Sequence, residues 1–297
     1  MKILYGIAPF HSMDVTDMCT RIKNGRIIFI PAGDCARAAI FTDPFPGTVK
    51  KIFVIFSDIH DIKEYNEKIE LNIDLSDNSI VTFSSDIMND KLNDIHNKLT
   101  LHNGSFHDEL PEQKMVIRAL RGHEKVLELG SNIGRNSLVI ASILQNSENL
   151  VTLESDPLTI ERLQKNRDAN NLSFRIENSA LSVKKLIQQG WCTIPSETLL
   201  EGYKWVNTIT FSDLQNKYKI IFDTLILDCE GAFYHILLDT PGILDNINLI
   251  IMENDYWDIA HKIYIDGVLK SKDFYRVYVE AGGWGPCYNN FYEIWAK

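Results

Sequence analysis

The sequence has few cysteines, and no spacing suggests that they act together. Its 297 residues include only five cysteines, and no C-x-x-C pair occurs. The five are Cys19, Cys35, Cys192, Cys229 and Cys287. Disulfide frameworks of secreted proteins and structural zinc sites use closely spaced cysteines, so we expect neither of them here. The sequence therefore predicts reduced thiols in a cytoplasmic protein.

Long apolar runs and concentrated positive charge are also missing. No stretch approaches the ~20 apolar residues of a membrane helix, and the apolar run at 1–7 is too short for a signal peptide. The formal net charge is -10, and no four lysines or arginines cluster together. Binding to nucleic-acid phosphates depends on basic side chains. We therefore expect neither a membrane nor a nucleic acid as partner, with RNA contact through a local patch left open.

The length of 297 residues favours two domains. Residues 1–100 are predicted to form a β-rich accessory domain that ends in a linker. Its predicted strands are bounded by turn residues and cover 2–7, 26–30, 51–56 and 69–75. The polar segment 86–103 is predicted to be a connecting helix or linker. No functional pattern stands out here, and we expect this region to mediate homodimerisation or to present an acceptor.

The clearest functional pattern lies at 126–137. A short apolar strand at 126–129 is followed by Gly130 and Gly134, and an apolar-periodic run that predicts a helix begins at Leu138. Strand, glycine turn and helix form the arrangement in which α/β folds bind nucleotide-like ligands.

The spacing of this turn indicates which ligand it suits. A dinucleotide fold has G-x-G-x-x-G, whereas this chain has Asn132 in place of the second glycine and no phosphate-binding lysine as in a P-loop. The polar side chains of Glu128 and Asn132 suit an ammonium group and an uncharged sugar. A ligand with an amino acid and an adenosine but no phosphates fits, which favours S-adenosylmethionine.

Polar residues follow the other predicted strands. Glu154 ends the second strand, 24 residues after Gly130, where an acid in nucleotide-binding folds accepts hydrogen bonds from ribose hydroxyls. The third strand leads into Asn178 and Ser179, which either edge an adenine ring or form a plain turn. The fourth strand ends at Asp228, and the fifth at Glu253.

The order of these elements predicts the fold. Five strand–helix units are followed by two strand-like runs at 274–279 and 291–295, joined by a glycine-rich turn. We therefore predict an α/β, Rossmann-like sheet of seven strands with a C-terminal antiparallel hairpin. The irregular segment 189–218 holds Trp191, Tyr203 and Trp205, which belong either to an acceptor pocket or to a core.

Residues 105–297 resemble the FkbM-type class I S-adenosylmethionine-dependent methyltransferases. The resemblance rests on 126–136, Glu154, 178–182 and above all 225–232. The fourth-strand motif of that family is Lys-Ile-Asp-Val-Glu-Gly-Ala-Glu. Asp228, Glu230, Gly231 and Ala232 match it, whereas Ile226 and Phe233 replace its lysine and its last glutamate. The composition is similar to versions encoded by large DNA viruses and some bacteria.

The resemblance implies that residues 101–297 transfer a methyl group to a hydroxyl of a sugar, glycan or other small molecule. Such a sugar includes deoxy- and amino-sugars. The main alternatives are an RNA or protein methyltransferase and a non-catalytic binding module. Amino-group methylation of bases typically uses Asn/Asp-Pro-Pro-Tyr at the fourth strand, and this chain contains no Pro-Pro.

The implied site is assigned residue by residue. The predicted cofactor-binding residues are Glu128, Gly130, Ser131, Asn132, Gly134, Asn136, Glu154, Ser155, Asn178, Ser179 and Asp228. Asp228 is the first candidate for the base that takes the proton of the acceptor hydroxyl, followed by Glu230 and Glu253. His235 is a further candidate. The same three carboxylates would also suit Mg²⁺, which is the less favoured alternative to a metal-free site.

Overall fold

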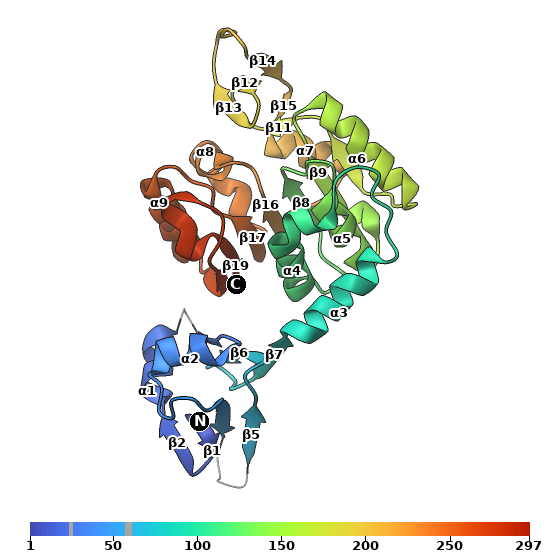
Figure 1. The fold of residues 1–297 in the computed structure, drawn as a ribbon. Coiled ribbons are helices and arrows are strands. Elements are labelled where there is room, and N and C mark those ends of the chain that lie inside the picture. The colour runs from blue at the N-terminus through green and yellow to red at the C-terminus, as the bar shows by residue number, and fades with distance from the viewer. Residues whose placement is uncertain (24–25, 57–60) are drawn as a thin grey trace. The chain divides into compact units, whose positions relative to one another are not determined.

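The computed structural model describes residues 1–23, 26–56 and 61–297 (Figure 1). The chain forms two compact units. The smaller unit consists of Met1–Lys91 with Tyr275–Val277, and the larger unit consists of Leu92–Phe274 with Tyr278–Lys297. The sequence-based boundary near residue 100 therefore falls close to the division near Lys91.

The smaller unit contains two antiparallel sheets, with strand orders β2-β1-β4-β5 and β3-β6-β7. Its elements are β1 (Lys2–Ala8), β2 (His11–Asp14), α1 (Thr16–Ile22), β3 (Ile27–Ile30), α2 (Asp34–Phe41), β4 (Lys51–Ile55), β5 (Ile62–Tyr65), β6 (Ile69–Asp74) and β7 (Ile80–Ser84). The four predicted strands are confirmed as β1, β3, β4 and β6. The two helices were not predicted, because runs of 7 and 8 residues are too short to show a clear helical period.

The segment between the units is helical. Helix α3 (Ser85–His96) covers most of the predicted connecting helix or linker. A 3₁₀ turn, η1 (Phe106–Glu109), leads into α4 (Leu110–Ala119), which has Pro111 in its first turn. Proline suits that position because its missing N–H would have no partner within the helix.

The larger unit is built on a mixed sheet of seven strands, in the order β10-β9-β8-β16-β17-β19-β18. The strands are β8 (Val126–Leu129), β9 (Leu150–Leu153), β10 (Arg175–Glu177), β16 (Thr224–Leu227), β17 (Leu249–Glu253), β18 (Tyr275–Glu280) and β19 (Tyr292–Ala296). The neighbours from β10 to β17 pair in parallel, and β19 runs antiparallel to β17. The predicted seven-stranded sheet is therefore confirmed, with β8, β16 and β17 in its middle.

Helices connect the parallel strands, as the alternation of the sequence predicted. They are α5 (Arg135–Ile143), α6 (Pro157–Ala169), α7 (Phe211–Tyr218), α8 (Ala232–Asp239) and α9 (Ile259–Ser271), and short 3₁₀ turns lie at η2 (Ser147–Asn149), η3 (Pro241–Leu244) and η4 (Gly285–Asn290). The Asp156 carboxylate caps α6 by accepting the backbone N–H groups of Leu158 and Thr159 at 2.8 and 3.0 Å. Such a cap fixes where the helix begins and therefore where the preceding loop must lie.

A small sheet between β10 and α7 was not predicted. Strands β12 (Leu186–Gln189), β13 (Cys192–Pro195) and β14 (Lys204–Val206) pair antiparallel in the order β13-β12-β14. Two short strands, β11 (Ala180–Leu181) and β15 (Thr208–Ile209), pair in parallel at its base. This insertion stands apart from the seven-stranded sheet (Figure 1).

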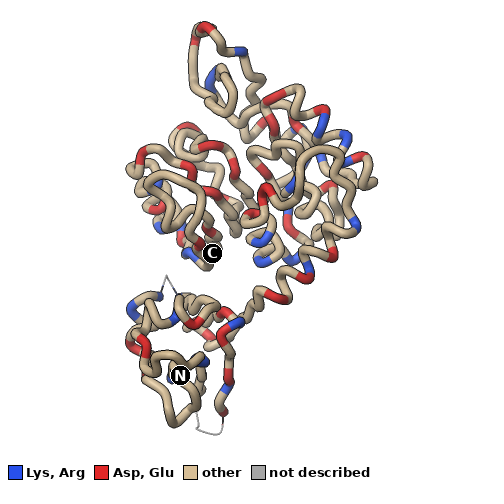
Figure 2. Tube along the Cα trace, in the orientation of Figure 1, with Lys and Arg blue, Asp and Glu red and all other residues tan. Residues whose placement is uncertain are grey.

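The distribution of charge, the state of the cysteines and the hydropathy of the helices can be compared with the expectations from the sequence. Lysines and arginines are scattered among the acidic residues along the chain (Figure 2). All five cysteines are free thiols. Among the described residues, no helix is both long enough and apolar enough to cross a membrane.

Candidate active site

The glycine turn after β8 packs directly against the end of β16. Gly130 and Gly134 have φ angles of +85° and +92°, a region that side chains rarely adopt. A Cβ atom at Gly130 would lie 1.6 Å from the carbonyl oxygen of Asp228. Glycine is therefore required at position 130, because a side chain would strain the backbone and would clash with Asp228. The turn holds the ends of β8 and β16 together.

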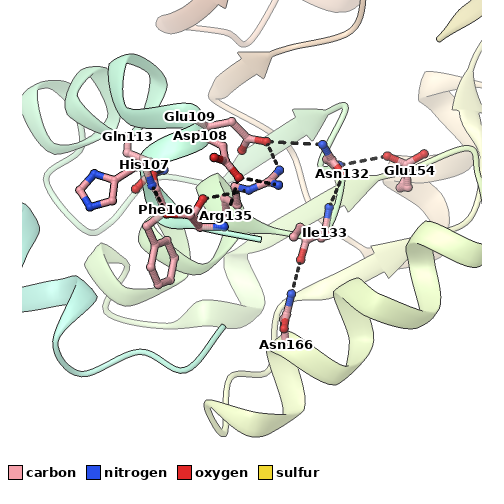
Figure 3. Close-up of polar contacts among 11 residues, drawn as sticks. Phe106, His107, Asp108, Glu109, Gln113, Asn132, Ile133, Arg135, Glu154 and Asn166 are labelled. Atoms are coloured by element: carbon pink, nitrogen blue, oxygen red, sulfur yellow. Dashed lines mark hydrogen bonds and ion pairs between the residues drawn. The ribbon is translucent and has the colours of Figure 1, made fainter. Parts of the chain in front are cut away.

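Asn132 organises the middle of this turn (Figure 3). Its backbone N–H donates to Oε2 of Glu154 at 3.0 Å, and its own Oδ1 accepts the backbone N–H of Ile133 at 2.9 Å. Oε1 of Glu154 accepts the backbone N–H of Asp156 at 2.8 Å. Because each carboxylate oxygen of Glu154 accepts a backbone N–H, the group is held in one orientation, with further acceptor capacity on each oxygen.

Arg135, which was not identified from the sequence as a site residue, links the end of the glycine turn to the segment 105–109. Arg135, the first residue of α5, contacts Glu109 at 2.7 Å and Asp108 at 3.0 Å, and it donates to the carbonyl of Ser105 at 3.1 Å (Figure 3). Three contacts in the plane of one guanidinium group define its position closely. Arg135 therefore ties the start of α5 to the segment that leads into α4.

A cavity of about 890 Å³ opens beside the turn. This volume is near the upper end of the roughly 300–1,000 Å³ of typical ligand sites. Its walls come from the glycine turn, the loop after β9, the β16–α8 turn, the loop after β17 and the β12–β13 hairpin. Seven of the predicted site residues line it: Gly130, Asn132, Glu154, Ser155, Ser179, Asp228 and Glu230.

The other six predicted residues are not among those that line the cavity. They are Glu128, Ser131, Gly134, Asn136, Asn178 and Glu253. Asn178 donates to the carbonyl groups of Glu154 and Ser155 at 3.0 and 3.2 Å, so it shapes the wall from behind. The Ser131 hydroxyl donates in the same way to the carbonyl of Leu153 at 3.3 Å. These residues position the lining rather than form it.

Glu128 lies differently from our expectation. We expected its side chain to face a ligand at the turn, but it is 1% exposed and accepts a hydrogen bond from the Ser137 hydroxyl at 2.5 Å. Successive side chains of a strand point to opposite faces, and Leu127 and Leu129 belong to the main hydrophobic core. Glu128 therefore points to the other face, beneath α5. Burial raises its pKa to about 7.

Three carboxyl groups from different elements gather at the end of β16. Glu253 lies within hydrogen-bonding reach of both Asp228 and Glu112, and its single proton can be shared with either of them. Burial, followed by the repulsion of neighbouring carboxylates, raises the pKa of Glu253 to about 11 and that of Asp228 well above its usual range. Burial also raises the pKa of Glu112 to about 7. Within the described chain, none of the three pairs with a lysine or arginine, so the cluster favours a cation nearby.

A second group of carboxyl side chains, the pair Glu230 and Asp255, also belongs to the cavity wall. Asp255 accepts the backbone N–H of Gly231 at 3.1 Å and shares a hydrogen bond with Glu230. Burial and the nearby Glu230 charge raise the pKa of Asp255 to about 7. Both residues line the cavity. In the described parts of the chain, no group of three or more histidine, cysteine, aspartate or glutamate residues is arranged to hold a metal ion.

Two histidines complete this side of the cavity. His235 on α8 and His261 on α9 both line it, with ring centroids 5.7 Å apart. The His261 ring also stacks on Tyr234 at 3.7 Å. Partial burial lowers the pKa of His235, which favours a neutral imidazole at pH 7. His235 therefore remains a second candidate for a proton acceptor.

Comparisons with known proteins find similar chains among solved structures. No protein-family model and no curated protein matches the chain. Among solved structures, an O-methyltransferase from Bacillus cereus in complex with SAH is 14% identical, with 72% of this chain and 92% of that chain covered and a TM-score of 0.42. The O-methyltransferase TomG from Streptomyces achromogenes in complex with SAM is 12% identical (66% and 81% covered, TM-score 0.40). An rRNA methylase from Streptococcus thermophilus is 9% identical (67% and 99% covered, TM-score 0.39).

Proposed function

We propose that the larger unit is an S-adenosylmethionine-dependent methyltransferase that methylates a hydroxyl group of a sugar. The observation that carries this proposal is the position of Glu154. Its carboxylate is fixed by two backbone N–H groups at the cavity wall, directly beside the glycine turn. This is the geometry needed to accept hydrogen bonds from two neighbouring ribose hydroxyls.

The residues of the cavity fit such a cofactor. Glu154 would hold the ribose, Ser179 would edge the adenine, and Gly130 with Asn132 would lie beside the methionine end. The unpaired carboxyl groups around Asp228 complement the positive charges of the cofactor's ammonium and sulfonium groups. Gly130 and Asp228 both line the cavity, so a ligand can contact both.

The chain's own residues would then supply alignment and a base. When bound, S-adenosylmethionine supplies a methyl group that an oxygen nucleophile can attack. Asp228 lies at the cavity wall, and its burial raises its pKa, which makes its carboxylate a stronger base. A cation next to a carboxyl group lowers its pKa, so Asp228 is deprotonated when the neighbouring site carries a positive charge. The proton of the acceptor hydroxyl then passes to an Oδ atom of Asp228.

The hydroxyl acceptor is supported by the FkbM-like segment at the end of β16. Asp228, Glu230 and Gly231 bring the proposed base, a second acid and a helix start to one cavity wall. Glu253, which we considered as a base from the sequence, lies behind Asp228 and hydrogen-bonds to it. We therefore assign Glu253 a positioning role.

Replacing Asp228 by asparagine tests this function. Asparagine keeps the size and one acceptor oxygen but carries no charge and cannot take a proton, so we expect D228N to bind S-adenosylmethionine measurably, although more weakly than wild type, and to lose turnover even when it is saturated with the cofactor. Binding is measured by calorimetry, and turnover by release of S-adenosylhomocysteine with a panel of sugar acceptors. Asp168→Asn, on the exposed side of α6, is the matched control. A D228N enzyme with wild-type turnover would remove Asp228 as the base.

A further inference from the structure

The acceptor half of the cavity has aromatic walls. Trp191 in the β12–β13 hairpin and Trp257 in the loop after β17 both line the cavity and are 68% and 85% exposed. The Trp257 ring is supported by Trp284, with centroids 4.3 Å apart. Large exposed aromatic rings in a concave wall mark a binding surface rather than a core. Flat rings of this kind stack on the apolar faces of cyclic ligands.

The same cavity is strongly acidic. Seven carboxyl-bearing residues line it, whereas Arg162 is the single arginine in its lining and no lysine is present there. Asp156 pairs with Lys204, and Asp239 pairs with Lys184, so these two acids are neutralised. Glu154 and Asp228 belong to the proposed cofactor half. The charge that is left for the acceptor comes from Asp258 and from the hydrogen-bonded pair of Glu230 and Asp255, in which Asp255 has a pKa of about 7.

Two of these acids lie near Trp257 in the chain, and the third contacts one of them. Asp255 and Asp258 flank Tyr256 and Trp257 in the chain, and Glu230 hydrogen-bonds to Asp255. Across the described residues, no lysine or arginine forms an ion pair with Glu230, Asp255 or Asp258. An anionic group placed here meets several negative charges in a partly enclosed space, where charge repulsion is stronger than in bulk water. A cationic group is attracted both by the carboxylates and by the faces of the aromatic rings.

We propose that this half of the cavity binds an unphosphorylated sugar ring that carries an amino group, and that it rejects nucleotide-linked and phosphorylated sugars. The inference rests on the proposed methyltransferase function and names its acceptor class. The aromatic rings select a cyclic ligand, and the carboxylates select its charge. Rejection of unsuited ligands by like charge is a common source of specificity.

The proposal also places the reaction relative to others. Sugars are activated by linkage to a nucleoside diphosphate, which carries the negative charge that this cavity disfavours. A glycosyl transfer, in which an acceptor oxygen replaces the nucleoside diphosphate at the sugar carbon, is the class of reaction that supplies such an acceptor. Methylation then acts on the finished glycoside rather than on the activated sugar.

The first experiment compares acceptors on the full-length protein. Methyl glycosides of three hexosamines, their 2-hydroxy counterparts, the hexosamine 1-phosphates and the nucleotide-linked hexosamines are titrated by calorimetry into protein saturated with S-adenosylhomocysteine. We expect the amino glycosides to bind at least about tenfold more tightly than their hydroxy counterparts, and the 1-phosphates and nucleotide sugars to bind at least about tenfold more weakly than the amino glycosides. Added salt should narrow these differences, because it screens the charges.

The second experiment assigns the preference to residues. Trp257→Ala should weaken all glycosides at least about tenfold, and Trp257→Phe should recover most of that loss. Trp205→Ala is the matched control, because Trp205 is an exposed tryptophan of the β13-β12-β14 insertion that lies outside the cavity lining. Glu230→Gln should reduce the preference for amino over hydroxy glycosides. Glu201→Gln, on the exposed β13–β14 connection, should leave both unchanged.

The outcomes separate this inference from the proposed function. If S-adenosylhomocysteine does not bind to the protein, the methyltransferase proposal itself is wrong. If it binds but nucleotide sugars or sugar phosphates bind as tightly as amino glycosides, the acceptor inference alone is overturned. The same holds if no glycoside binds or if W257A binds every glycoside as wild type does. Thermal unfolding of each variant shows whether a loss reflects the fold.

Discussion

Replacing Glu154 by alanine removes the carboxylate that we assign to the ribose. In the structure, its two oxygens accept the backbone N–H groups of Asn132 and Asp156 at 3.0 and 2.8 Å, and burial raises its pKa. A hydrogen bond to a charged group contributes about 1.5–3 kcal/mol. The E154A protein should therefore bind S-adenosylmethionine about 10- to 150-fold more weakly than wild type.

Two effects contribute to such a loss, and they can be separated. Glu154 contacts the ribose in our proposal, and it also holds the turn through Asn132. Calorimetry with adenosine and with 2′,3′-dideoxyadenosine distinguishes the two roles. Wild type should lose affinity when the ribose hydroxyls are removed, whereas E154A should bind both nucleosides equally. A coupling of this kind between a ligand group and a side chain indicates direct contact.

The control for this experiment is Glu161→Ala. Glu161 is an exposed glutamate on α6, so its removal changes the net charge by the same amount without altering the cavity wall. We expect wild-type affinity for this control. If E154A also binds S-adenosylmethionine as wild type does, Glu154 is not part of the cofactor site and the main support for the proposed function is lost. If E154A still distinguishes the two nucleosides, the carboxylate acts only by holding the turn.

Two further predictions concern the glycine turn and the buried acid beneath it. Gly130→Ala should destabilise the protein by more than the roughly 1–3 kcal/mol expected for a strained backbone and should abolish cofactor binding, because its Cβ would lie 1.6 Å from the Asp228 carbonyl oxygen. The control is Gly47→Ala, because Gly47 also has a positive φ of +81° but an added Cβ there would meet no atom within 4 Å. This variant therefore introduces backbone strain without a steric clash, and equal melting temperatures for the two variants would contradict the prediction. Glu128 has a pKa of about 7 in the folded protein, compared with an ordinary value of 4.5. Between pH 4.5 and pH 7 the folded protein therefore holds a proton on Glu128 that the unfolded chain releases. The free energy of unfolding falls as the pH rises through this range, by roughly 3 kcal/mol at most. Glu128→Gln stays neutral and should show a flatter stability profile in urea titrations from pH 5 to pH 8, and an unchanged profile would mean that Glu128 is not the group responsible.

The larger sheet could be predicted because its strands have a clear signature in the sequence. The runs at β8, β9, β16 and β17 are almost entirely apolar, as expected for parallel strands covered on both faces, and each is followed by a turn or a helix cap. The polar residues at the strand ends gather at one edge because the strands are parallel. For this reason Glu154 and Asp228 were placed at the cavity without any structural information.

Other features could not be predicted because they depend on contacts between distant segments. Strands β12 and β14 lie more than ten residues apart and have mixed composition, so nothing local distinguishes them from a loop. The contacts of Arg135 with Asp108 and Glu109 join segments about 26 residues apart, and an arginine at a helix start carries no distinctive pattern. The face on which Glu128 lies was open to prediction, because its flanking leucines already occupy the core face.

The carboxyl cluster lowers the stability of the fold and at the same time supports the proposed function. A desolvated carboxyl group without a cation is unfavourable, and the cluster brings together the buried Glu112 of α4 and the half-buried Asp228 and Glu253 at the ends of β16 and β17. Hydrogen bonding within the cluster offsets part of this cost, since Glu253 keeps its single proton and can donate it to one neighbour at a time. The remaining cost is reduced only when a positive charge enters the cavity. Residues that oppose folding in this way are retained mainly where they serve a ligand. The same acids that weaken the empty fold would therefore strengthen its hold on a cationic methyl donor and, through Glu230 and Asp255, on an amino-bearing acceptor.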